Sequence, residues 1–137
     1  MRTRNFKKTL GYVTRLIGLD GKNEADIEAL KSEKRFISAD VQFDKDSGKP
    51  FVKIDNENIT IESFMAGILK KLYCNMNKGL EQDGLPLVLG VPSYATDYHK
   101  KALLKASYIA DIKNVRVVEE SSAILYDFLK DNVKELK

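Results

Sequence analysis

This sequence has few of the residues from which crosslinks and metal sites are built. Its 137 residues include one cysteine, Cys74, and one histidine, His99. A single cysteine cannot form a disulfide within the chain, and one cysteine with one histidine excludes a Cys/His zinc site. The sequence also lacks the G-x-G-x-x-G, G-x-x-x-x-G-K-[ST] and G-x-S-x-G patterns. Nothing therefore predicts a glycine-rich phosphate loop or a strained nucleophilic serine.

Long hydrophobic runs and a strong excess of one charge are absent as well. No apolar run approaches the ~20 residues that a membrane-spanning helix needs, and the amino end lacks the apolar core of a signal peptide. The formal net charge is +3, and the densest basic cluster, at residues 2–8, is interpreted as a solvated end. No basic face with interleaved aromatics indicates nucleic-acid binding. We therefore expect a cytoplasmic protein with no nucleic-acid or membrane partner.

The residues that are present predict one folded α/β domain. Hydrophobic residues make up 43% of the chain, enough for a core. Two short, valine-rich runs, Leu87–Val91 and Val115–Val118, flank one amphipathic segment, which predicts a strand, a helix and a parallel strand. Ligands in such sheets bind at the carboxyl ends of the strands. Here those ends are followed by residues 92–94 and 119–122.

The other segments predict short helices, an antiparallel meander and two longer helices. A short helix is expected within residues 9–19, a surface helix or loop at 23–34, and short strands near 36–43, 51–54 and 59–61. The periodicity of residues 61–80 predicts a helix whose apolar face packs on the parallel sheet. That face holds Ile61, Met65, Ile68, Leu69, Leu72, Met76 and Leu80. Thr96 is expected to cap the next helix. A last helix from Ser121 should point Ile124, Leu125, Phe128 and Leu129 inward.

Few side chains indicate chemistry by themselves. His99 is expected on the surface, and Cys74 is expected to be an exposed, inert thiol. Adjacent Glu119 and Glu120 would point to opposite faces of a strand, and the simplest interpretation is that they favour the positive start of the next helix. A functional role for Glu120 stays open. A small enzyme that uses Glu120 with Ser93 or Tyr94 is a weaker alternative.

Several short segments nevertheless follow one another in an informative order. The chain contains Val91-Pro92-Ser93-Tyr94-Ala95-Thr96-Asp97, then Lys100, Ile109-Ala110-Asp111, Arg116-Val117-Val118 and Glu119-Glu120-Ser121-Ser122. Residues 9–18 add T-L-G-Y-V-T-R-L-I-G. This order and spacing resemble the ATPase domain of the 70-kDa heat-shock chaperones and their 110-kDa relatives. The Thr96-Asp97 pair is more similar to the 110-kDa branch.

The resemblance implies an actin-like, ribonuclease-H-like ATPase lobe in a stress-response chaperone. Residues 1–60 would form an upper subdomain of lobe I, and residues 61–137 part of the lower subdomain. In the parent protein, Glu120 would help organise the magnesium and γ-phosphate region of bound ATP. Pro92 and Lys100 would relay the nucleotide state to other domains. The implied partners are the remainder of the ATPase domain, a partner chaperone and protein clients.

The departures from the family pattern bear on catalysis. Thr14 occupies the position of the family's catalytic lysine, and a neutral side chain cannot supply the cation that phosphoryl transfer uses. Glu119, Asp111 and Ser121 replace an asparagine, a glycine and a proline of the pattern. The family's phosphate loops have no counterpart here. We therefore expect a middle fragment of lobe I that binds no cofactor alone and is not competent as a catalyst. The alternative is a stand-alone interaction module that has lost ATPase activity.

Overall fold

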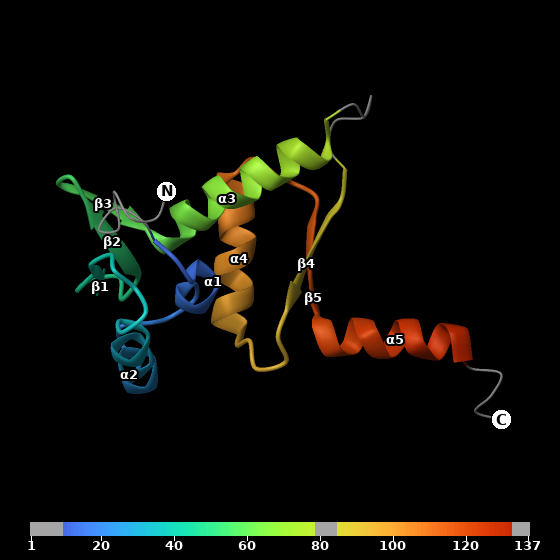
Figure 1. Cartoon of the computed structure of the whole chain (residues 1–137), viewed down its shortest axis with the longest axis horizontal. Coiled ribbons are helices and arrows are strands. Elements are labelled where there is room, and N and C mark those ends of the chain that lie inside the picture. Colours follow the sequence, from blue (N-terminus) through green and yellow to red (C-terminus); the bar gives the residue numbers. More distant parts are fainter. Residues whose placement is uncertain (1–9, 79–84, 133–137) are drawn as a thin grey trace.

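The computed structural model of this chain describes residues 10–78 and 85–132 (Figure 1). The basic cluster at residues 2–8 and Leu80, the last residue of the predicted apolar face, lie outside the described residues. Five helices and five strands are described, in a mixed α/β arrangement. They are α1 (Val13–Leu16), α2 (Glu24–Glu33), β1 (Val41–Phe43), β2 (Pro50–Ile54), β3 (Glu57–Thr60), α3 (Ile61–Met76), β4 (Leu87–Val91), α4 (Asp97–Ile109), β5 (Val115–Glu119) and α5 (Glu120–Asn132).

The three short strands β1, β2 and β3 form the predicted antiparallel meander, in that order. Strands β2 and β3 are joined by Asp55 and Asn56, whose φ angles of 50° and 86° fit a two-residue hairpin. The first strand is shorter than predicted, and Phe36 is exposed. Thr60 ends β3 and caps α3, so Ile61 begins a helix and does not belong to the strand.

The parallel strand–helix–strand unit is confirmed. Strand β4 pairs with β5 from Leu87↔Val115 to Val91↔Glu119, and α4 is the crossover helix between them. The sequence pattern predicts that α4 has Tyr98, Ala102, Ala106, Ile109 and Ala110 on one side, and the structure buries only the three alanines of this set. Its alanines, Ala102 and Ala106, are buried, while Tyr98 is 66% exposed. The small alanine side chains allow α4 to lie close to α3. The larger Tyr98 ring, at the start of α4, remains exposed.

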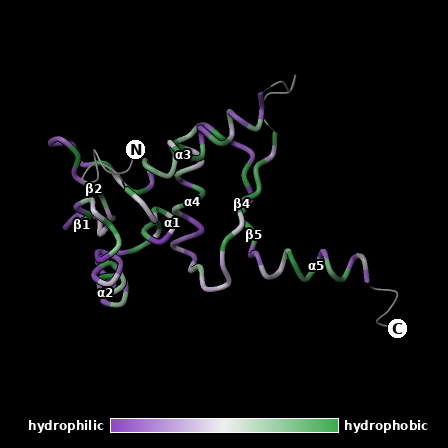
Figure 2. The backbone as a smooth tube through the Cα atoms, viewed as in Figure 1, coloured by the Kyte–Doolittle hydropathy of each residue, from purple (hydrophilic) through white to green (hydrophobic). Residues whose placement is uncertain are grey.

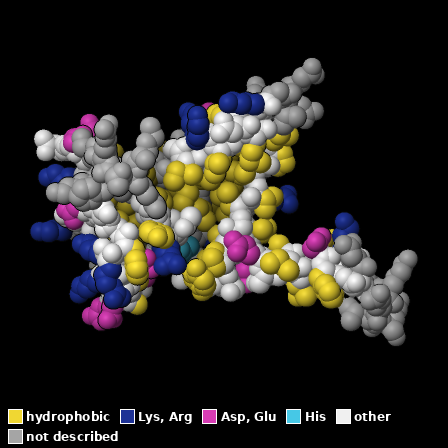
Figure 3. All heavy atoms as spheres, in the orientation of Figure 1, with side chains coloured by type: hydrophobic (Ala, Val, Ile, Leu, Met, Phe, Trp, Pro, Cys, Tyr) yellow, Lys and Arg dark blue, Asp and Glu magenta, His cyan; other side chains and the backbone are white. Residues whose placement is uncertain are grey.

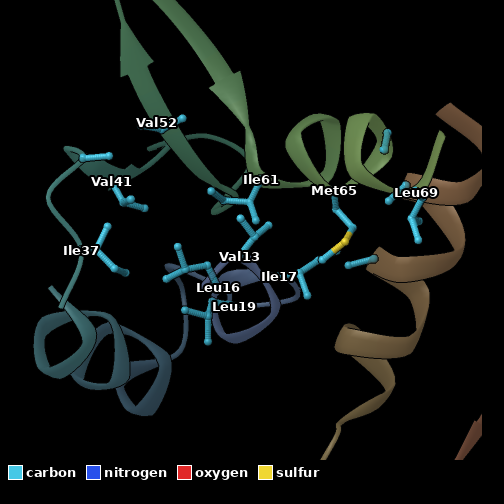
Figure 4. Close-up of a cluster of buried hydrophobic side chains, with 14 of the residues drawn as sticks. Val13, Leu16, Ile17, Leu19, Ile37, Val41, Val52, Ile61, Met65 and Leu69 are labelled. Atoms are coloured by element: carbon cyan, nitrogen blue, oxygen red, sulfur yellow. The ribbon is translucent and has the colours of Figure 1, made fainter. Parts of the chain in front are cut away.

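One hydrophobic core connects the antiparallel sheet with α1, α3 and α4 (Figure 4). Leu16, Val41, Val52 and Ile61 are at most 1% exposed. Figure 4 shows Val41 pointing from the sheet toward α1, and Met65 and Leu69 pointing from α3 toward the neighbouring helix. Burying a side chain of this kind contributes roughly 1.5–3 kcal/mol, so this cluster fixes the relative positions of the elements.

The prediction for α3 was wrong about which residues share its buried face. Ile61, Met65 and Leu69 are buried, four residues apart, whereas Ile68, Leu72 and Met76 are 41%, 54% and 64% exposed. The second row is offset from the first by one residue, which rotates it ~100° around a helix. The buried row packs mainly on α4 and α1, not on the parallel sheet as predicted.

The prediction for α5 was also wrong. Ile124, Leu125 and Phe128 are 70%, 57% and 58% exposed, and Leu129 is half-buried. The helix extends away from the rest of the molecule, and apolar stretches lie along it without a covering element in the described part of the chain (Figures 1 and 2). An amphipathic pattern identifies the face that needs a partner, but not whether this chain supplies one. Among the described helices, none has the length and apolar character to cross a bilayer.

Candidate functional site

Two of the predicted site residues lie at the carboxyl ends of the parallel strands. Val91 and Glu119 form the last pair of the β4–β5 register. Pro92 and Glu120 therefore come directly after the ends of two adjacent strands. The carbonyl of Pro92 accepts a hydrogen bond from the Ala95 amide at 2.9 Å, which turns the chain toward α4. The structure thus brings these two residues to one edge of the sheet, where open α/β folds bind their ligands.

The side chain of Glu120 lies next to Gly90, the fourth residue of β4. A Cβ atom at Gly90 would be 3.0 Å from Glu120 Cγ and 3.3 Å from its Oε1, so the glycine leaves room for the glutamate. The Glu120 side chain is exposed. Glu119 is half-buried, and its Oε1 accepts a hydrogen bond from the Ser121 hydroxyl at 2.8 Å. Of the two carboxylates, Glu120 is the one that remains available at this edge.

Lys100 lies in the first turn of α4, close to a tightly packed junction. Thr96 caps this helix: its hydroxyl accepts from the His99 amide and lies 2.8 Å from His99 Nδ1. The cap was predicted. His99, which was expected on the surface, is half-buried and lies against the capping hydroxyl. The backbone of Gly18 packs directly on His99. A Cβ atom at Gly18 would lie 2.5 Å from His99 Cα.

Thr14 is exposed on the short helix α1, because its neighbours Val13 and Leu16 face the core. The next residue, Arg15, does not offer a free cation in its place. Its Nη1 is 3.0 Å from Glu33 Oε1 on α2, and its guanidinium lies 5.8 Å from the centroid of the Tyr12 ring. The ion pair holds the Arg15 guanidinium toward α2, so the residue next to the neutral Thr14 does not supply a substitute cation.

Sequence reasoning missed one cluster of charges. Glu62, in the first turn of α3, is 9% exposed, and its Oε1 lies 3.4 Å from Lys49 Nζ and 3.5 Å from Lys105 Nζ. The nearby Lys49 ammonium group and burial lower the pKa of Lys105, and the Glu62 carboxylate opposes this change. These three residues come from distant parts of the chain, and no local pattern brings them together.

The predicted site residues supply only part of a nucleotide site. Within residues 10–78 and 85–132, no hydrogen bond or ion pair joins any two of Thr14, Pro92, Lys100 and Glu120. In the same ranges, no three His, Cys, Asp or Glu side chains gather as a metal ion would require. Glu120 could offer one carboxylate to magnesium. These four residues therefore do not form a complete magnesium or nucleotide site, and their assigned roles stay predictions.

Comparison with known proteins places this fold in a known class. A parallel strand pair beside a small antiparallel sheet is consistent with part of an Hsp70 ATPase lobe. The family model described as "Hsp70 protein" matches residues 1–135. The chain belongs to the Hsp70 family.

Two relatives show how much of a family member this chain represents. It is 32% identical to the "Chaperone protein dnaK" of Trieres chinensis, with 79% of this chain and 20% of that protein covered. It is 26% identical to the "Chaperone protein DnaK" of Carsonella ruddii (strain PV), with 95% of this chain and 21% of that protein covered. The chain thus spans about a fifth of the length of these relatives.

Proposed function

We propose that this chain is part of the first lobe of a chaperone ATPase domain and does not hydrolyse ATP alone. Residues 1–60 would be the upper subdomain and 61–137 part of the lower one, both contributing to the same core. In a full-length cytoplasmic parent, the function would be ATP-dependent protein folding, or nucleotide exchange on a partner chaperone if the parent belongs to the 110-kDa branch. The match to the Hsp70 family over residues 1–135 supports the family role.

The observation that carries the proposed lack of catalysis is the exposed, neutral Thr14 at the position of the family's catalytic lysine. A cation positioned at the transferring phosphoryl group stabilises the charge that develops in the transition state. Arg15 is paired with Glu33, so the next residue does not provide that cation. Glu120 would contribute one carboxylate, and the other phosphate-binding parts would have to come from the rest of a parent protein.

Isothermal titration calorimetry with Mg-ATP tests this proposal. We expect no saturable binding to this chain, while a full-length Hsp70 chaperone under the same conditions gives a saturating signal. Glu120→Gln is the matched variant, and it should leave the trace unchanged. Saturable binding in the micromolar range that Glu120→Gln weakens would contradict the proposal.

A stand-alone interaction module is the alternative, and one feature of the surface favours it. Hydrophobic side chains gather over α3 and along α5 (Figure 3). They include Ile68, Leu72 and Met76 on α3 and Ile124, Leu125, Tyr126 and Phe128 on α5. Apolar groups in this number indicate a surface that another polypeptide covers. The partner would be the rest of an ATPase domain in the first proposal and a separate protein in the second.

The mass of the native protein distinguishes the two proposals. An antibody raised against this chain, used on an immunoblot of the source cells, would detect a band several times larger than 15.5 kDa if the chain is part of a full chaperone. A band at 15.5 kDa would contradict that proposal and support a separate module. In that case, the exposed residues of α3 and α5 become the first surface on which to map a partner.

A further inference from the structure

A cleft of about 250 Å³ lies between the antiparallel sheet and α4. The loop between β1 and β2 forms one wall, α4 forms another, and the start of α3 closes the space between them. Its lining comprises residues 18–20, 47–50, 61–62, Tyr98, Lys101, Ala102 and Lys105. Thr14, Pro92, Lys100 and Glu120 do not line it, so the cleft is separate from the predicted nucleotide region.

The cleft contains more positive than negative charge. Lys49, Lys101 and Lys105 line it, and the lining carboxylates are Glu62 and Asp20. One oxygen of Glu62 is shared by the ammonium groups of Lys49 and Lys105, at 3.4 and 3.5 Å. One carboxylate neutralises one ammonium group, so this pair of lysines keeps an uncompensated charge. Repulsion between the two cations would fall if a second anion joined them.

The position of each group suits an incoming anion. Glu62 is deeply placed, with 11% of its side chain exposed, whereas the side chains of Lys49 and Lys105 are 42% and 50% exposed. Each ammonium group has three donors, and its contact with Glu62 can use only one of them. The remaining donors can bind a second anion, because both lysine side chains are partly exposed.

The floor of the cleft strengthens these electrostatic contacts. Leu19, Pro50, Ile61 and Ala102 are apolar or aliphatic and line the same space. Charges beside an apolar wall interact through a lower effective dielectric than charges in bulk water, so an anion held here gains more from each ammonium group. The floor also offers contact to a small carbon skeleton attached to the anion.

We propose that this cleft binds a phosphate group, either as inorganic phosphate or as a small phosphate monoester, through Lys49, Lys101 and Lys105. Phosphate matches the several ammonium donors with several acceptor oxygens, and it carries enough charge to bridge two lysines. The buried Glu62 holds Lys49 and Lys105 near each other, and it also competes with the ligand for their donors.

Titration with inorganic phosphate, followed by two-dimensional NMR, tests the proposal. Ionic strength is held constant with sodium chloride, because surface electrostatics depend on salt. We expect saturable shifts at residues 47–49 and in the first turn of α3, with a dissociation constant in the millimolar range. Lys105→Met should weaken binding about five- to tenfold. Lys71→Met, on the exposed side of α3, is the matched control and should have no effect.

Glu62→Gln gives a prediction of the opposite sign. Removing the competing carboxylate leaves both lysines without their anion, so phosphate should bind more tightly to this variant than to the unaltered chain. If Glu62→Gln or Lys105→Met fails to give a folded spectrum, Lys101→Met provides the test, because it leaves the Glu62 contacts in place. That variant should also weaken phosphate binding.

The outcomes are distinguishable. Absence of saturable shifts at the cleft into tens of millimolar phosphate would overturn the proposal, as would equal binding by Lys105→Met and Lys71→Met. Titration with glycerol 3-phosphate separates the two sources of the phosphate group. If glycerol 3-phosphate binds more tightly than inorganic phosphate, the apolar floor contacts the carbon skeleton of the ligand. If both bind equally, the site recognises the phosphate group alone.

Discussion

At the scale of single residues, Gly18 determines how α1 meets α4. Its φ of 79° lies in the left-handed region that side chains disfavour, and its Cα faces the backbone of His99 without an intervening atom. Both conditions require glycine. The close contact places the segment that contains Thr14 beside the first turn of α4, which contains Lys100.

Gly18→Ala should therefore be strongly destabilising. The added Cβ would lie 2.5 Å from His99 Cα, and the backbone would be strained as well, so we expect a loss of at least about 2 kcal/mol in the free energy of unfolding. Gly67→Ala is the matched control, because Gly67 lies within α3 and has open space around its Cα. That change should stabilise the chain by about 0.5–1 kcal/mol. Urea unfolding measures both values, and equal effects would contradict this role of Gly18.

Asp44, in the loop between β1 and β2, gives a pH-dependent prediction. The Ser47 hydroxyl donates to its Oδ1 at 2.6 Å and the Ser47 amide at 2.8 Å, and these bonds lower the pKa of Asp44 below its usual 3.8. Since the folded state has the lower pKa, the resulting stabilisation is present above pH 3.8 and is lost as the pH falls through the folded value. NMR titration of the Asp44 carboxyl should show this.

Ser47→Ala is the test of the cause. It removes the hydroxyl donor, so the Asp44 pKa should rise toward 3.8. The Ser47→Thr variant keeps a hydroxyl and should keep the pKa low. An unchanged titration in Ser47→Ala would assign the lowered pKa to the backbone contacts of the loop instead.

At the scale of elements, local sequence determined the type of most helices and strands. The alternation of apolar and turn residues predicted the meander, and two valine-rich runs predicted the parallel pair. The strand-end rule also placed Pro92 and Glu120 at one edge. Local pattern could not determine which apolar row of α3 faces inward, because Ile68, Leu72 and Met76 satisfy the same periodicity as the buried row. The Lys49–Glu62–Lys105 cluster was missed for a related reason: its members meet only through tertiary packing.

The two faces of α3 can be compared with one pair of substitutions. Leu69 is 7% exposed and Leu72 is 54% exposed on the same helix. Leu69→Ala should cost about 2–5 kcal/mol of unfolding free energy, because it leaves a cavity in the core. Leu72→Ala should change stability by less than about 1 kcal/mol. Equilibrium unfolding in urea compares them directly, and a similar loss from both variants would mean that the outer row is also packed in solution.

At the scale of the whole molecule, the described residues form one packed region and one open region. The antiparallel sheet, α1, α3 and α4 share a core, while α5 has no buried side chain among those described. Parallel sheets are ordinarily covered on both faces, yet Val88 on β4 is 57% exposed and Val118 on β5 is 37% exposed. The sequence contains the apolar residues for a larger core, and the described elements leave many of them exposed. This is why the pattern of α5 predicted burial that the structure does not contain.

Amide hydrogen exchange should resolve these two regions. Helices α4 and α5 each have 13 residues, so they form a matched pair that differs mainly in burial. We expect the central amides of α5 to exchange more than about a hundredfold faster than those of α4, because α5 can open without disrupting the core. Similar protection in both helices would show that α5 is covered in solution, for example by a second copy of the chain.

In a full-length parent, α5 should become protected, since the remainder of the ATPase domain would pack on Ile124 and Phe128. Protection that appears only in the longer protein would support the fragment proposal, and an α5 that remains open there would favour a surface reserved for a separate partner.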